Sequence, residues 1–113
     1  MRSDALSTDL YQLTMLQAYL DGGLGERAVF ELFVRRLPRP RSFLVAAGLA
    51  PAMSFLESVR FGDDDLAAVR ACGRFRPAVI DWLARFRFGG DVDAMPEGTF
   101  FFCDEPILRV TAP

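Results

Sequence analysis

The 113-residue sequence contains no histidine, lysine or asparagine. Without histidine, the chain cannot supply an imidazole base, a histidine metal ligand or a phosphohistidine. Its 13 basic side chains are all arginines and face 15 acidic residues, which gives a net charge of −2. This balance excludes the strongly basic surface of a generic nucleic-acid binder. We therefore expect no nucleic-acid partner.

Cysteines and long apolar runs are also scarce. Cys72 and Cys103 lie far apart without metal-ligand spacing, so we expect buried, reduced thiols and no metal site. The longest apolar run, Phe43–Met53, contains a glycine and a proline and is too short to span a membrane. The first residues lead into polar sequence, unlike a signal peptide. The sequence predicts a cytoplasmic protein with no membrane partner.

Hydrophobic residues make up 51% of the chain, and we expect residues 1–113 to form one domain with its own core. Ser7, Thr8 and Asp9 are N-cap candidates before a stripe of leucines at helical spacing, which predicts a helix ending near Leu20. An acidic run at 63–65 and prolines in first-turn positions favour further helices. These are expected at about 50–59, 64–71 and 77–86.

Apolar segments bounded by proline, glycine and acidic residues predict strands at about 29–35, 43–47, 91–95, 99–103 and 107–110. The run Phe100-Phe101-Phe102 projects aromatic rings to both faces of a strand, so we expect both faces to be covered. Gly48 is expected to adopt an unusual backbone angle between a strand and a helix. The predicted fold is α+β, with helices packed on a mostly antiparallel sheet.

Five blocks of sequence resemble the nicotinate phosphoribosyltransferases, in family order. They are Thr8–Met15, Phe30–Pro38, Phe43–Leu49, Pro96–Thr99 and Glu105–Val110. Family members are much longer than this chain. The resemblance therefore implies the N-terminal domain of a type II phosphoribosyltransferase, truncated before the α/β barrel that follows.

The same resemblance implies a reaction. The full-length enzyme would join nicotinate and phosphoribosyl pyrophosphate, giving nicotinate mononucleotide and pyrophosphate in NAD biosynthesis. It would act as a homodimer, with Mg²⁺ and ATP as the implied cofactors, whereas this chain alone would bind none. The phosphorylated histidine of the family must lie outside a chain without histidine. We therefore expect no catalytic residue here and an inactive isolated chain.

Tyr11 and Asp9 are the candidates for nicotinate binding. From the helical pattern alone, Tyr11 is a half-exposed packing residue and Asp9 an N-cap. The resemblance matches Tyr11 with a tyrosine that stacks on the pyridine ring in the neighbouring subunit's active site, a contact suited to an electron-poor ring. It implies that Asp9 lines the mouth of that site.

Arg35 and Arg36 are the candidates for phosphate binding. Their guanidinium groups bind phosphate oxygens in pairs, and the resemblance implies contact with phosphoribosyl pyrophosphate across the dimer. A solvated loop of arginines is the alternative. Arg39 and Arg41 lie where the family varies, so we assign them no role. Glu97 shows no evident partner in the sequence.

Two other functions remain open. The chain could be a non-catalytic dimerisation or docking module, in which case its apolar sheet should be exposed. It could also come from a relative specific for nicotinamide or quinolinate, because the cation that would bind the nicotinate carboxylate is not identifiable here.

Overall fold

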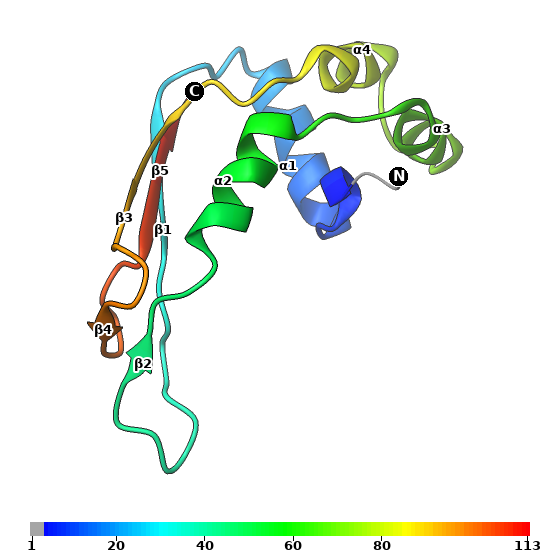
Figure 1. Ribbon diagram of the computed structural model, residues 1–113. Coiled ribbons are helices and arrows are strands. Elements are labelled where there is room, and N and C mark those ends of the chain that lie inside the picture. The colour runs from blue at the N-terminus through cyan, green and yellow to red at the C-terminus, as the bar shows by residue number, and fades with distance from the viewer. Residues whose placement is uncertain (1–3) are drawn as a thin grey trace. The chain divides into compact units, whose positions relative to one another are not determined.

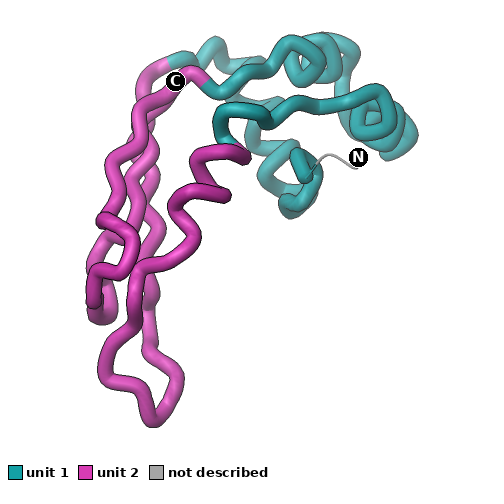
Figure 2. The backbone as a smooth tube through the Cα atoms, viewed as in Figure 1, with its two compact units in different colours: residues 1–25, 56–88 teal, residues 26–55, 89–113 magenta. Residues whose placement is uncertain are grey.

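The computed structural model describes residues 4–113, which form two compact units (Figure 2). Unit 1 contains the described residues up to Gly25 together with Leu56–Phe88. Unit 2 contains Glu26–Phe55 and Gly89–Pro113. Each unit is therefore assembled from two separate stretches of sequence.

Unit 1 is helical (Figure 1). After a short 3₁₀ helix, η1 (Asp4–Leu6), it contains α1 (Leu10–Asp21), α3 (Asp63–Ala71) and α4 (Pro77–Arg85). The acidic run and the proline act as predicted. The N–H of Gly62 donates to the Asp65 carboxylate at 2.9 Å, and Pro77 occupies the first turn of α4.

The core of unit 1 lies between these helices. Five apolar side chains of α3 and α4 are buried, among them Leu83 with 1% exposure. The leucine stripe predicted for the first helix packs against them, except for Leu10, which is 47% exposed. Trp82 also packs on this cluster. The buried residues are Leu66, Val69, Val79, Ile80 and Leu83.

Unit 2 contains two antiparallel sheets, in agreement with the predicted α+β class. In the three-stranded sheet, β5 (Leu108–Ala112) lies between β1 (Ala28–Leu32) and β3 (Asp91–Ala94). The second sheet pairs β2 (Leu44–Val45) with β4 (Phe100–Phe101). The helix α2 (Leu49–Ser58) begins in unit 2 and ends in unit 1.

The three-stranded sheet has an apolar face and a polar face. In the register, Phe30 pairs with Val110 and Val110 pairs with Val92, so these side chains share one face. On the other face, Arg109 lies between Glu31 and Asp93 and donates to Glu31 at 2.8 and 3.0 Å. The pair is exposed and contributes little to stability, about 0–1 kcal/mol.

The phenylalanine run differs from the prediction. Phe101 is 4% exposed, whereas Phe100 is 66% exposed and Phe102 is also exposed. Successive side chains of a strand point to opposite faces, and only the Phe101 face is covered by the chain. On the open face, Phe43 makes an edge contact with Phe100 at 5.2 Å between ring centroids.

The expectation of two buried thiols is also wrong. Cys72 is exposed just beyond α3, and Cys103 is half-buried; both are free. Within residues 4–113, no helix combines the length and the apolar character that crossing a membrane requires.

Candidate functional site

Asp9 occupies the N-cap position of α1 with an extended backbone, at φ −84° and ψ 148°. Its carbonyl accepts the N–H of Gln12 at 3.1 Å, which closes the first turn. The Asp9 side chain, however, makes no capping hydrogen bond. The predicted role of the carboxylate as a cap is therefore wrong, because backbone bonding alone closes this turn and the side chain stays exposed.

Tyr11 lies in the first turn of α1, two residues after Asp9, and is 59% exposed. Met15 and Tyr19 follow at intervals of four residues and are also exposed. This spacing places the three side chains on one face of the helix. The Thr14 hydroxyl donates to the Tyr11 carbonyl at 2.9 Å. Tyr11 thus offers an open ring on a fixed helical backbone, which a second flat ring could stack against.

Arg35 and Arg36 follow β1 in a bend and are exposed. The prediction of a strand continuing to Arg35 is wrong, since β1 ends at Leu32. Extending its register with β5 by two residues would place Val34 opposite Pro106, which has no N–H to donate. Within the described chain neither guanidinium forms an ion pair, so both are available to an anion.

The rest of this loop carries Arg39 and Arg41, which are also exposed. The Arg41 N–H donates to the Pro38 carbonyl at 2.8 Å, closing a turn inside the loop. The loop therefore presents four exposed guanidinium groups over seven residues, with Arg35 and Arg36 nearest the sheet.

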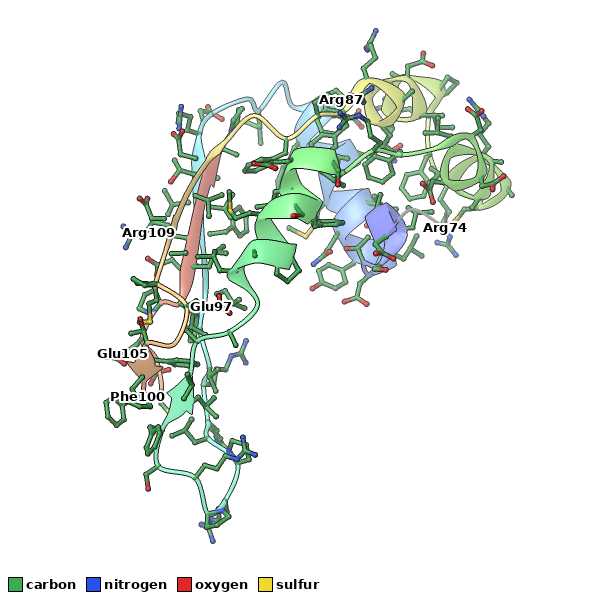
Figure 3. The ribbon with its side chains drawn as sticks, viewed as in Figure 1. Arg74, Arg87, Glu97, Phe100, Glu105 and Arg109 are labelled. Atoms are coloured by element: carbon green, nitrogen blue, oxygen red, sulfur yellow. The ribbon has the colours of Figure 1, made fainter. Side chains whose placement is uncertain are left out.

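Glu97 has partners that the sequence did not reveal. Its carboxylate accepts the N–H groups of Gly48 and Leu49, the latter at 3.0 Å, at the start of α2 (Figure 3). Gly48 has the positive φ expected of it, +97°. The contact joins residues 49 and 48 positions apart, so no local pattern indicates it. Two features of the sequence could have suggested the contact. A helix N-terminus has free N–H groups that need acceptors, and a distant turn carries an acidic residue that can accept them.

The predicted residues fall into two groups. Asp9 and Tyr11 belong to unit 1, and Arg35 and Arg36 belong to unit 2. Within residues 4–113, no three acidic or cysteine side chains converge to hold a metal ion. Unit 1 offers an exposed aromatic ring and, two residues earlier in the sequence, an exposed carboxylate. Unit 2 offers two exposed guanidinium groups without an ion pair in the described chain.

Comparison with known proteins gives a consistent result. Residues 6–113 match the family model for the nicotinate phosphoribosyltransferase (NAPRTase) N-terminal domain. The chain is 50% identical over 109 residues to nicotinate phosphoribosyltransferase pncB2 of Mycobacterium tuberculosis, covering 96% of this chain and 24% of that protein. It is 41% identical over 115 residues to the nicotinate phosphoribosyltransferase of Bacillus subtilis, covering 99% and 24%.

A solved structure is similar as well. The crystal structure of human nicotinic acid phosphoribosyltransferase matches with a TM-score of 0.81 and 36% identity, over 94% of this chain and 22% of that one. The chain thus spans about a quarter of the length of these relatives.

Proposed function

Because the chain belongs to the family of nicotinate phosphoribosyltransferase N-terminal domains, we propose that it serves the transfer of a phosphoribosyl group to nicotinate. The reaction forms a bond between the pyridine nitrogen and the sugar carbon C1 and breaks the bond from C1 to pyrophosphate. Nicotinate mononucleotide and pyrophosphate are the products, as NAD biosynthesis requires. The observation that carries the proposal is the match over nearly the whole chain to relatives named for nicotinate.

The chemistry assigns the chain a positioning task. A sugar that loses pyrophosphate develops oxocarbenium character, as in glycoside cleavage, and the attacking nitrogen must be held near C1. Stacking on Tyr11 would fix the plane of the pyridine ring, and its exposure leaves that face open to a ligand. The Asp9 carboxylate makes no capping bond and precedes Tyr11 by two residues, and it would line the mouth of the same site.

Arg35 and Arg36 would bind phosphate oxygens of phosphoribosyl pyrophosphate. Their support is chemical: both guanidinium groups are exposed and lack an ion pair within the described chain. Two forked donors side by side suit a polyanion that carries several oxygens.

The residues of this chain do not fit the ATP coupling implied for the full-length enzyme. Coupling to ATP through a phosphohistidine would require a histidine, which this sequence lacks. We propose that the phosphoryl-accepting residue, the residues that hold Mg²⁺ and with them turnover belong to parts of the enzyme outside this chain. We place the enzyme in the cytoplasm as a homodimer in which Tyr11 reaches the neighbouring subunit's site.

The test uses the full-length enzyme, because we expect the isolated chain to be inactive. Tyr11→Ala should raise the KM for nicotinate about five- to tenfold, since it removes one stacking contact. Tyr11→Phe keeps the ring and should restore most of the affinity. Tyr19→Ala is the matched control: it removes an exposed tyrosine from the same helix face. Equal effects of the two alanine variants would contradict the proposal.

One observation favours a second function, a non-catalytic docking module. The apolar face of the three-stranded sheet carries Phe30, which is 70% exposed, and Leu32 is exposed beside it. A module that only docks should bind its partner equally well with Tyr11 replaced by alanine, and no nicotinate-dependent turnover should accompany binding. The relatives named above all act on nicotinate by name, so a nicotinamide- or quinolinate-specific enzyme gains no support from them.

A further inference from the structure

Glu105 closes the turn between β4 and β5. Its Oε2 accepts the N–H of Phe102 at 2.7 Å, a side-chain contact that spans three residues (Figure 3). Inside this turn Asp104 adopts a left-handed backbone with φ 62°. Aspartate tolerates that conformation better than most residues, yet something must hold it there. The Glu105 contact supplies such a constraint.

The β4–β5 turn is hydrogen-bonded to the segment that leads into Arg35 and Arg36. The Asp104 N–H donates to the Val34 carbonyl at 3.0 Å, and the Ile107 N–H donates to the Leu32 carbonyl at 2.8 Å. Pro106 interrupts the regular ladder at this point because it has no N–H. Asp104 therefore takes over as the donor to Val34, the residue immediately before Arg35.

On its other side the arginine loop continues into β2, whose Leu44 and Val45 pair with β4. The Arg41 N–H donates to the Pro38 carbonyl, which shapes the loop internally. The Asp104–Val34 bond is consequently the backbone tether nearest to Arg35 and Arg36. Its geometry depends on the turn that Glu105 closes.

We propose that Glu105 is a positioning residue for Arg35 and Arg36, acting through the β4–β5 turn and the Asp104–Val34 hydrogen bond. The inference rests on the proposed function of these arginines in binding phosphoribosyl pyrophosphate. Glu105 itself does not touch the substrate: it fixes the backbone from which the two guanidinium groups extend. Losing this constraint would let the pair of cations sample many positions, which lowers affinity for a polyanion.

The test is a double-mutant cycle in the full-length enzyme. Glu105→Ala should raise the KM for phosphoribosyl pyrophosphate about fivefold, while kcat and the KM for nicotinate stay within about twofold. Glu105→Gln retains an acceptor oxygen and should recover most of the affinity. Glu26→Ala removes another exposed glutamate of unit 2 and should change nothing. In an Arg35→Ala/Arg36→Ala background, Glu105→Ala should have no further effect.

Hydrogen exchange measured by mass spectrometry separates positioning from unfolding. Glu105→Ala should accelerate exchange in peptides spanning 102–107 and leave the α3 and α4 peptides unchanged.

The outcomes distinguish the two levels of the proposal. If the double arginine variant raises the KM for phosphoribosyl pyrophosphate and Glu105→Ala does not, the positioning role is overturned and the proposed function stands. If Glu105→Ala acts equally with and without the arginines, the positioning role is likewise overturned. If the double arginine variant leaves that KM unchanged, the phosphate-binding role of the arginines fails, and the role of Glu105 fails with it.

Discussion

The two units differ in how far they bury their apolar side chains. Unit 1 buries leucine, isoleucine and valine between α3 and α4 and covers them with the leucines of α1. In unit 2, among the described residues, only Ala46 and Phe101 are buried, and phenylalanines such as Phe30 and Phe100 are open to solvent. Unit 1 is therefore stabilised by its own core, whereas unit 2 leaves much of its apolar surface open to solvent.

The largest effect is expected from removing a core side chain of unit 1. Leu83→Ala should lower the free energy of unfolding by about 3–4 kcal/mol, because the side chain is almost fully buried and its loss leaves a cavity. Chemical denaturation followed by circular dichroism measures the change. Leu10→Ala, on the exposed side of α1, should cost less than about 1 kcal/mol. Similar losses for the two variants would mean that α3 and α4 do not form the stabilising core.

A smaller effect is expected in unit 2. Phe101→Ala should cost about 2–3 kcal/mol, below the usual range for a buried phenylalanine, because few buried residues surround it. Phe100→Ala, one position away on the open face, should change stability by less than about 1 kcal/mol. Thermal unfolding of both variants measures the two losses of stability. An equal loss at both positions would show that both faces of β4 are covered in solution.

The smallest effect is expected from the loss of a polar contact. Glu97→Ala removes the acceptor for the Gly48 and Leu49 N–H groups and should cost about 1–2 kcal/mol. The contact is exposed, which keeps the loss below that of a core residue. Glu57→Ala, an exposed glutamate within α2, serves as the control and should be neutral. Hydrogen exchange of the first turn of α2 should accelerate only in the Glu97 variant.

The helices were predictable because their signals are local. Pro77, the acidic residues that follow Gly62, and Gly22 mark helix ends within or next to the helices' own sequence. The observed bounds differ from the predicted ones by at most one residue. The antiparallel class of the strands was predicted as well. Their division into two sheets was not, because pairing depends on partners distant in sequence.

Among the candidate residues, the sequence identified types and neighbourhoods but not contacts. The exposure of Arg36 and Tyr11 agrees with a binding role without testing it. The Asp9 carboxylate follows a good capping pattern and still makes no capping bond, since a cap depends on the side-chain rotamer as well as on residue type. The carboxylates of Glu97 and Glu105 accept hydrogen bonds from backbone N–H groups. Hydrophobic periodicity does not predict such contacts.

The central position of β5 has a consequence for the order of folding. Both β1 and β3 pair only with β5 in their sheet, and β5 is made after both of them. A growing chain must therefore carry β1 unpaired while α2, α3, α4 and β3 are synthesised. Pairings between such distant segments form slowly, and exposed strand edges can associate wrongly in the meantime. Helix formation in unit 1 should thus precede sheet formation in unit 2, with β1 as the segment most exposed to chaperones and aggregation during synthesis.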